Sequence, residues 1–194
     1  MKIIFATGNE NKVEEIRELL PEGIEIVSLK EMGYLEDIEE TGKTLEENSV
    51  LKAQTIYDQY KLPVLAEDTG LEVDVLNKAP GVYSARYAGE NCDAEKNMEL
   101  LLKNLKSETK RTAQFRTVAT FIDNNTSNLY EGVVRGEILK EKRGEKGFGY
   151  DALFLPAGFK KSFAEMSMTE KGLISHRAIS IKKFIEHFYS KLKS

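Results

Sequence analysis

Near its N-terminus the chain reads KIIFATGNENK over residues 2–12. The apolar run 2–6 is typical of a short buried strand. After a few polar residues, apolar side chains recur from Val13 to Leu20 with the spacing of one helix face, and Pro21-Glu22-Gly23 ends that helix. Alternation of strands with helices is the mark of α/β proteins, so this segment favours an α/β fold.

The junction between this strand and this helix is a candidate binding site. A helix N-terminus that directly follows a strand has free backbone N–H groups, which bind phosphate readily. Gly8 lets a ligand approach the backbone closely, and Lys12 adds a positive charge one turn into the helix. Thr7 or Asn9 can instead cap the helix and leave Lys12 in solvent. The residues alone leave both interpretations open.

The rest of the chain first continues the alternation and then changes to paired strands. We expect further strands at 24–29, 63–66, 71–76, 113–122, 129–139 and 152–155, with helices at 45–60, 94–105 and 180–192. Segment 32–44 has no clear period and is predicted to be a loop. These elements predict an α/β protein with a mixed sheet. No repeat or linker divides the chain, so residues 1–194 are predicted to form one domain without a clear internal boundary.

Composition narrows the class of protein. Of the 194 residues, 41% are apolar and 31% are charged, which is ordinary for a soluble globular protein. No apolar run approaches the roughly 18 residues of a membrane span, and the N-terminal apolar stretch is too short for a signal peptide. Cys92 is the only cysteine, so no internal disulfide can form, and we expect a cytoplasmic location.

The charge pattern bears on possible partners. The net charge is −4 and no Lys/Arg-rich block stands out, whereas proteins that hold polymeric nucleic acid usually present a basic face. We therefore expect neither a nucleic acid polymer nor a membrane as a partner. A phosphorylated ligand would need a few local residues and a metal ion to balance its charge. Gly42-Lys43-Thr44 is no phosphate-binding P-loop, because the required earlier glycine is replaced by Asp37.

Two acidic pairs lie on separate segments. Glu39-Glu40 is in the predicted loop, and Glu67-Asp68 follows a predicted strand. Mg²⁺ takes hard oxygen ligands, typically one or two carboxylates together with substrate phosphates and waters. Ligands of open α/β sheets bind beyond the carboxyl ends of strands, where Asp68 is expected, with Gly70 permitting a tight turn. A solvated loop and a capping aspartate explain the same residues, so both interpretations stay open.

A glycine-rich segment carries an aromatic side chain. Gly147 and Gly149 flank Phe148 and free the backbone to bring its ring against a flat ligand. An aromatic face stacks on a base, and the nearby Asp151 can bind polar groups at the base edge. A hairpin turn with two core aromatic residues explains this pattern about as well.

Cationic residues also directly follow a helix cap. Ser175 is a natural N-cap, and His176 and Arg177 come next. The positive end of a helix dipole disfavours cations at this place, so the charge hints at a ligand. His187 lies on the predicted last helix and is interpreted as structural.

In this order, these segments resemble one family along nearly the whole chain, the inosine triphosphatase-like or non-canonical purine NTP pyrophosphatase family. The matching segments are Thr7-Gly8-Asn9 with Lys12, Glu39 before Thr41-Gly42, Glu46-Glu47-Asn48 with Lys52, Asp68-Thr69-Gly70-Leu71, 79–87, Phe148-Gly149-Tyr150-Asp151, Phe163-Ala164-Glu165-Met166, Lys171 and Ser175-His176-Arg177. Each segment alone is a weak signal, whereas the ordered set is specific.

The resemblance implies an elongated α/β fold, with a mixed sheet flanked by helices and a nucleotide cleft between two lobes, usually in a homodimer. It implies Mg²⁺-dependent hydrolysis of ITP, dITP and XTP to the monophosphate and pyrophosphate, which cleanses the nucleotide pool. It also makes Asp68 the catalytic base and, with Glu39, a metal ligand. The implied substrate contacts are Thr7, Gly8, Asn9, Lys12, Lys52, Thr69, Phe148, Gly149, Tyr150, Asp151, Lys171, His176 and Arg177. Glu67 stands where many members of the family have Asp, which leaves the role of Glu67 open.

The chemistry of base selection agrees with this resemblance. Choosing hypoxanthine and xanthine over adenine requires donors aimed at a 6-oxo group, and His176 and Arg177 are suitable donors. One alternative is a pyrophosphatase for modified pyrimidine nucleotides, which base preference would separate. Another is a nucleotide-binding regulator without turnover. The paired acids argue against the regulator, because binding alone does not need a positioned base.

Overall fold

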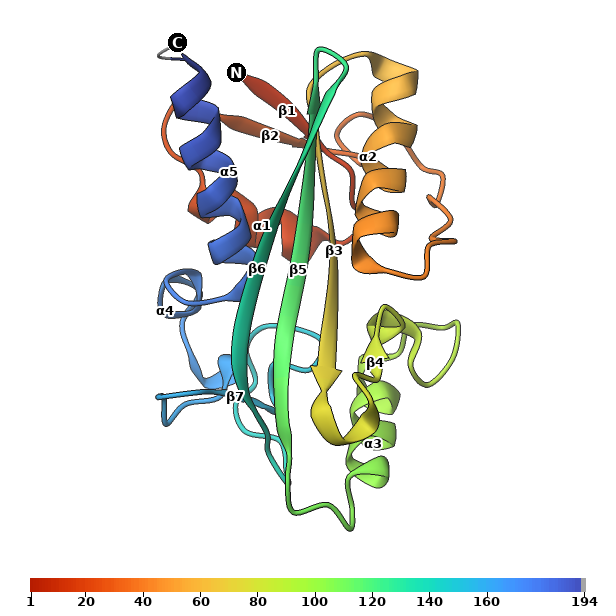
Figure 1. The fold of residues 1–194 in the computed structure, drawn as a ribbon, viewed down its shortest axis with the longest axis vertical. Coiled ribbons are helices and arrows are strands. Elements are labelled where there is room, and N and C mark those ends of the chain that lie inside the picture. Colours follow the sequence, from red (N-terminus) through yellow and green to blue (C-terminus); the bar gives the residue numbers. More distant parts are fainter. Residues whose placement is uncertain (193–194) are drawn as a thin grey trace. The chain divides into compact units, whose positions relative to one another are not determined.

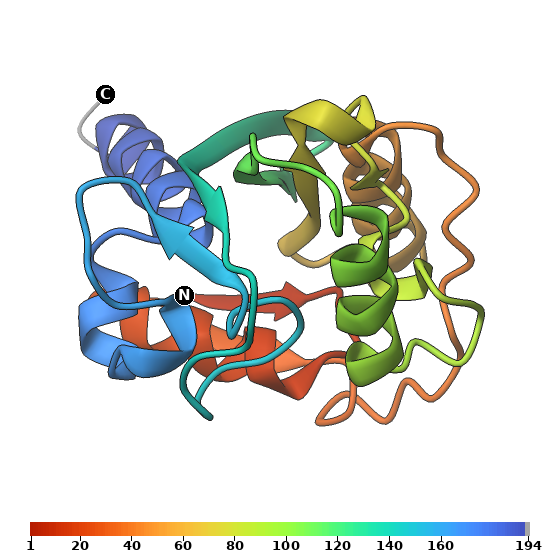
Figure 2. The ribbon, with the colours of Figure 1, turned by 90° about the horizontal axis from the view of Figure 1, so that it is seen from below.

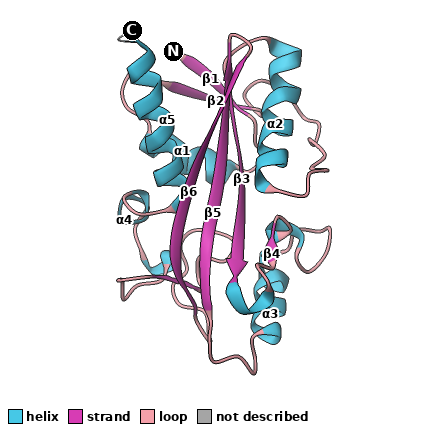
Figure 3. Ribbon diagram, in the orientation of Figure 1, coloured by secondary structure: helices cyan, strands magenta, loops and turns pink. Residues whose placement is uncertain are grey.

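A computed structural model describes residues 1–192 of the chain and shows a mixed α/β fold (Figure 1). The strands are β1 (Lys2–Phe5), β2 (Glu25–Ser28), β3 (Val64–Val73), β4 (Pro80–Gly81), β5 (Thr112–Asp123), β6 (Thr126–Ile138) and β7 (Phe154–Pro156). The helices are α1 (Glu10–Leu19), α2 (Leu45–Tyr60), α3 (Ala94–Asn104), α4 (Met168–Gly172) and α5 (His176–Leu192). Figure 3 shows helices flanking the strands, which confirms the predicted fold class.

One sheet joins the strands in the order β2-β1-β3-β5-β6-β7, and β4 pairs with β3 outside this path. β1 runs parallel to both β2 and β3, whereas β4 and β7 are antiparallel to their neighbours β3 and β6. The sheet is therefore mixed, as predicted. None of the helices within residues 1–192 has the length and apolar character needed to cross a bilayer.

The chain divides into two compact units. Unit 1 comprises Met1–Asp68, Thr117–Gly132 and the chain from His176 to Leu192, and unit 2 comprises Thr69–Arg116 and Val133–Ser175. The ranges of β3, β5 and β6 each extend from one unit into the other. Lys12, Lys52, Glu67, Asp68 and Arg177 belong to unit 1, and the glycine-rich segment 144–149 belongs to unit 2.

Unit 1 has a core on each face of its sheet, because successive side chains of a strand point to opposite faces. Ile3 and Phe5 pack in a cluster with α1 and α5, and Ile4 packs in a second cluster with α2. Figure 1 shows α1 and α5 on one side of these strands and α2 on the other. The two clusters bury Ile3–Phe5 of β1 and Val64–Ala66 of β3, directly before the strand ends that carry the candidate site.

Unit 2 has its own core, built on aromatic side chains. The ring of Phe115 lies 4.8 Å from that of Phe154, and the Phe154 and Phe163 rings lie 5.2 Å apart. Leu101 of α3 belongs to the same cluster. In the view from below, α3 (green) and the light-blue segment around β7 lie on opposite sides of this unit (Figure 2).

The predicted strands 63–66 and 71–76 are one continuous strand, β3, so the expected turn at Gly70 was wrong. Gly70 is needed for a different reason: a Cβ there would lie 2.6 Å from the carbonyl oxygen of Gly81 in β4. Glu67 and Asp68 therefore lie inside a strand, buried, instead of following one.

Two element boundaries also differ from the predicted ones. β5 and β6 are joined by a two-residue turn at Asn124 and Asn125, with φ of 47° and 59°, so this hairpin turn is shorter than expected. α5 begins at His176 rather than at 180, directly after Ser175. Arg177 therefore lies in the first turn of a helix.

Candidate active site

The start of α1 is capped from within the chain. The Oδ1 of Asn9 accepts hydrogen bonds from the N–H groups of Asn11 and Lys12, at 3.0 and 3.4 Å. Thr7 Oγ1 accepts one from the N–H of Asn9 at 3.2 Å. The capping interpretation is thus confirmed for Asn9, and contact of this turn with phosphate stays a prediction. A Cβ at Gly8 would meet nothing within 4 Å, so packing does not explain this glycine.

Lys12 is mostly buried, so the alternative interpretation that leaves it in solvent does not hold. Its side chain is 15% exposed, and its Nζ lies 3.2 Å from Oε1 of Glu67. Burial lowers the pKa of Lys12, while the neighbouring Glu67 charge opposes that shift. The structure therefore holds a partly desolvated cation in the first turn of α1, where the helix dipole also favours an anion.

Glu67 and Arg177 form the centre of a buried charge network in unit 1. Arg177 Nε donates to both carboxylate oxygens of Glu67, at 3.0 and 2.9 Å, and Nη2 donates to Oε1 at 2.7 Å. Arg177 Nη1 donates to Glu15. The side chains of Glu67 and Arg177 are 0% and 1% exposed. The cation after the helix cap thus has partners within the chain, and its contact with a purine stays a prediction.

The electrostatics of this network keep Glu67 charged. Burial raises the pKa of its carboxyl, but the charges of Arg177 and Lys12 and the hydrogen bonds from Arg177 outweigh burial and hold that pKa well below its usual range. Glu15 and Glu67 together balance the two cations, so the network has no net charge. The open role of Glu67 is therefore at least structural: it anchors the side chains of Lys12 and Arg177.

The neighbouring Asp68 belongs to a second group of charged and polar side chains, separate from the Glu67–Arg177 network. Its Oδ1 accepts a hydrogen bond from Lys52 Nζ at 3.2 Å, and its Oδ2 accepts one from Asn48 Nδ2, also at 3.2 Å. Lys52 Nζ donates as well to Oε1 of Glu40, at 2.5 Å. One ammonium group therefore lies between carboxylates from both acidic pairs, and Glu40 rather than the exposed Glu39 is the member of its pair that reaches it.

This environment changes the acidity of Asp68. Burial raises its pKa, the Lys52 charge opposes that shift, and the Glu40 charge adds to it. The net effect is a pKa above the ordinary value of aspartate, which makes the Asp68 carboxylate a better proton acceptor. Lys52 keeps a raised pKa in spite of burial, because Asp68 and Glu40 stabilise its charge.

In unit 2, the glycine-rich segment wraps around Asp151. Gly147 and Gly149 have φ of 73° and 61°, and a Cβ at Gly147 would lie 2.1 Å from Oδ2 of Asp151. The same Oδ2 accepts hydrogen bonds from the Phe148 N–H at 3.0 Å and from Lys171 Nζ at 2.5 Å. Lys171 Nζ also lies 5.0 Å from the centre of the Phe148 ring. The predicted residues Phe148, Asp151 and Lys171 are therefore in direct contact with one another.

Tyr150, another predicted substrate contact, has its side chain in the core of unit 2. It is 5% exposed, and its hydroxyl donates to the carbonyl oxygen of Ser84 at 2.9 Å. A role for Tyr150 in substrate contact stays a prediction. Its buried side chain anchors the glycine-rich segment to the core of unit 2. Thr69 is half-buried on β3, and His176 is buried at the start of α5.

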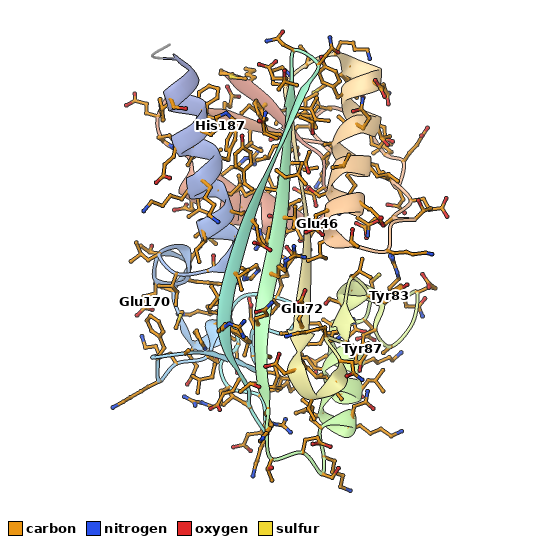
Figure 4. All side chains as sticks on the ribbon, in the orientation of Figure 1. Glu46, Glu72, Tyr83, Tyr87, Glu170 and His187 are labelled. Carbon is orange, nitrogen blue, oxygen red and sulfur yellow. The ribbon has the colours of Figure 1, made fainter. Side chains whose placement is uncertain are left out.

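Ser84 holds the segment between β4 and α3, where Figure 4 labels Tyr83 and Tyr87. The Ser84 hydroxyl donates to the carbonyl oxygen of Gly81 at 2.6 Å and accepts the N–H of Leu71 at 2.8 Å. This buried serine therefore ties the segment to β3 and, through Tyr150, to the glycine-rich segment. Its place in the sequence motif 79–87 is explained by these structural contacts.

Residues 3–187 match the model of the Ham1 family. The chain belongs to the Ham1 family. It is 51% identical over 187 residues to the dITP/XTP pyrophosphatase of Christiangramia forsetii, covering 96% of this chain and 98% of the relative. It is 47% identical over 184 residues to the dITP/XTP pyrophosphatase of Bacillus subtilis, covering 93% of each chain.

Solved structures of Ham1 proteins share the fold. The Staphylococcus aureus Ham1 protein aligns with a TM-score of 0.88 and 38% identity, covering 98% of this chain and all of the other. The Coxiella burnetii HAM1 protein aligns with a TM-score of 0.89 and 36% identity, over 98% of this chain and 99% of the other. At this identity and coverage, the fold described above is the fold of Ham1 proteins.

Three residues next to the site were not among the predicted site residues. Glu40 and Asn48 reach the Asp68 group, and Glu15 completes the network around Arg177. Glu40 belongs to the acidic pair that the sequence offered as possible metal ligands, and Asn48 lies in a matched sequence segment without an assigned role. Glu15 lies on the polar side of α1 and left no sequence signal, because its partner is 162 positions away.

Proposed function

We propose that this protein hydrolyses purine nucleoside triphosphates with a 6-oxo base, namely ITP, dITP and XTP, to the monophosphate and pyrophosphate. Such an activity removes these nucleotides from the pool. The observation that carries the proposal is the buried Asp68 with a raised pKa, held between Asn48 and Lys52. Relatives that align over nearly the full chain are named dITP/XTP pyrophosphatases, which supports the choice of substrate.

The residues around Asp68 fit a divalent cation. Within residues 1–192 no group of three or more His, Cys, Asp or Glu side chains is arranged to hold a metal ion. Two carboxylates do come together at Lys52, those of Asp68 and Glu40, and Mg²⁺ commonly uses only one or two protein carboxylates beside phosphates and waters. We propose these two acids as the ligands of Mg²⁺, with Glu40 in place of the Glu39 expected from the sequence.

Mg²⁺ would neutralise phosphate charge and polarise the scissile phosphate. It is needed because the two candidate phosphate-binding cations are already balanced by carboxylates: Lys12 by Glu67, and Lys52 by Asp68 and Glu40. In the proposed reaction Asp68 accepts a proton from the water that attacks the α-phosphorus. Lys12 and Lys52 hold phosphate oxygens, and the N-terminus of α1 beside Gly8 favours the same negative charge.

Unit 2 supplies groups suited to the nucleoside. Phe148 is half-buried and offers an aromatic ring, while Asp151 is fixed by Lys171 and by the Phe148 N–H. We propose that Phe148 stacks on the purine and that Asp151 and Lys171 bind polar groups of the nucleoside. His176 and Arg177 are proposed as donors to the 6-oxo group, with Arg177 already held in place by Glu67 and Glu15. A cytoplasmic homodimer is proposed from the family resemblance.

Removing divalent cations should abolish turnover. EDTA is expected to stop hydrolysis of ITP, and excess Mg²⁺ is expected to restore it, because the two cations proposed to hold phosphate, Lys12 and Lys52, are already paired with carboxylates. The assay is release of product from ITP with and without chelator. A thermal melt in EDTA serves as the control, and it should match that of the untreated protein. Hydrolysis that continues at full rate in EDTA contradicts the proposed metal requirement.

Phe148→Ala should weaken all purine substrates alike. Loss of base stacking costs about 1–3 kcal/mol, roughly a five- to hundred-fold loss in kcat/KM, and stacking does not depend on the groups at the base edge. The measurement is kcat/KM for ITP, XTP and ATP in both proteins. Phe159→Ala is the matched control, because Phe159 is a 46% exposed phenylalanine of the same unit outside the glycine-rich segment. An unchanged kcat/KM for ITP in Phe148→Ala would exclude the stacking role.

Product release and substrate preference separate the proposed function from the two alternatives. A nucleotide-binding regulator would bind ITP without releasing any product. A pyrophosphatase for modified pyrimidine nucleotides would prefer those substrates to ITP. The proposed function predicts product release from ITP and a lower kcat/KM for ATP and for pyrimidine nucleoside triphosphates.

A further inference from the structure

Asn48 connects Asp68 to the loop that carries Glu40. It lies in the first turn of α2, two residues after Glu46 (Figure 4), and is fully buried. Its Oδ1 accepts the N–H of Gly42 at 2.8 Å, and its Nδ2 donates to Oδ2 of Asp68 at 3.2 Å. The Gly42 N–H can only donate, so the amide oxygen must face it and the amide NH₂ must face Asp68.

The end of this loop lies directly against the first turn of α2. A Cβ at Gly42 would lie 2.5 Å from Oδ1 of Asn48, so only glycine allows the approach. The next N–H, that of Lys43, donates to the side chain of Glu47 at 2.6 Å. Two successive backbone N–H groups are therefore bound by side chains of the first turn of α2.

The neutral amide of Asn48 suits its surroundings. Asp68 and Glu40 already place two carboxylates around one ammonium group, that of Lys52. An acidic residue at position 48 would repel Asp68, and a cationic one would neutralise it and lower its basicity. An asparagine supplies one donor and one acceptor at the required places without changing the local charge.

We propose that Asn48 is a positioning residue: it fixes the loop that carries Glu40 and orients the Asp68 carboxylate through its amide N–H. The second half rests on the proposed function, because it assumes that Asp68 acts on the attacking water. The first half, the tie between Asn48 and Gly42, is independent of any activity.

Two variants test the two parts of this proposal separately: the orientation of Asp68 and the tie between Asn48 and Gly42. Asn48→Asp keeps an oxygen for the Gly42 N–H but replaces the donor that faces Asp68. We expect wild-type hydrogen exchange at the Gly42 amide, an unchanged KM for ITP, and a kcat lower by at least roughly ten- to hundred-fold, because one hydrogen bond to a charged group is lost and the new carboxylate repels Asp68. Asn48→Leu is similar in size but loses both hydrogen bonds. It should lower kcat and also speed exchange at the Gly42 amide.

Tyr57→Phe is the control for a purely structural effect on α2. Tyr57 lies on the same helix, and its hydroxyl donates to Asn125 Oδ1 at 3.2 Å and accepts the Asn125 N–H at 3.0 Å, away from Asp68. We expect this variant to melt at a lower temperature and to keep the wild-type kcat and the wild-type exchange at Gly42.

The outcomes distinguish this inference from the proposed function. A wild-type kcat in Asn48→Asp overturns the orienting role, and unchanged Gly42 exchange in Asn48→Leu overturns the tie to the loop. If wild-type protein does not hydrolyse ITP, or Asp68→Asn hydrolyses it normally, the proposed function fails instead. The exchange measurement at Gly42 still decides the structural half in that case.

Discussion

Asp68→Asn is expected to lower kcat for ITP by about 10² or more, the usual contribution of a general base. An asparagine at this position cannot take a proton from water. It keeps the size of aspartate, and its amide oxygen can still accept the hydrogen bond that Lys52 donates to Asp68. Lys52 also keeps Glu40 as a partner, so no charge is left buried without compensation.

The measurement for this variant is kcat at saturating ITP and Mg²⁺, together with a thermal melt. We expect the melting temperature to fall moderately, because the new amide NH₂ faces the donor of Asn48, while turnover falls by the much larger factor. Near-normal turnover would remove Asp68 from the mechanism. A large drop in melting temperature would show instead that the variant tests folding and not catalysis.

Glu67→Gln is expected to lower the free energy of unfolding by about 3–5 kcal/mol, the typical cost of removing one partner of a buried ion pair. Glu67 is fully buried and binds Arg177 through both carboxylate oxygens, and Lys12 lies 3.2 Å away. Without the carboxylate charge, Lys12 loses its ion pair with Glu67, and Arg177 keeps its contact with Glu15. For a chain of this length, the melting temperature should fall by roughly 6–20 °C.

Glu25→Gln provides the matched control at the surface. Glu25 pairs with Lys2 at 3.5 Å, and the two side chains are 61% and 74% exposed. Exposed pairs contribute little to stability, so we expect the melting temperature of this variant to stay near that of the wild type. Equal melting temperatures for Glu67→Gln and the wild type would show that the buried network is dispensable.

The same network gives stability a pH dependence. The folded-state pKa of Glu67 lies below its unfolded value, so the stabilisation is complete above the unfolded pKa of about 4.3 and is lost as pH falls through the folded pKa. Wild-type protein should therefore lose stability below about pH 4. Glu67→Gln should lack this pH-dependent part of the free energy of unfolding. The measurement is the difference in free energy of unfolding between the two proteins at a series of pH values from 7 to 3.

Some helices and strands were predictable because the spacing of their apolar residues in the sequence matches the faces that are buried in the core. Helix 45–60 was predicted with the bounds that α2 has, since Thr44 caps it and its apolar residues face one core cluster. β1 and α1 were predictable for the same reason. β3 was not predicted as one strand, because the buried charges of Glu67 and Asp68 interrupt its apolar pattern. Their partners come from distant positions, which no local pattern reveals.

The sequence indicated which residues belong to the candidate site, but it indicated only some of the contacts between their side chains. Lys12, Lys52 and Asp68 were predicted as site residues, and the last two form an ion pair. The choice between Glu39 and Glu40 required the structure, because a loop without a period does not show which side chain points toward Lys52. The pairing of Arg177 with Glu67 required it as well, since the two lie 110 positions apart.

The products of ITP hydrolysis test the central claim most directly. Wild-type protein is incubated with ITP and Mg²⁺, and pyrophosphate and orthophosphate are measured separately while the nucleotide products are resolved. We expect IMP and pyrophosphate in equal amounts from the first time point, because the proposed attack is on the α-phosphorus. Stepwise release of orthophosphate with IDP as an intermediate would contradict it.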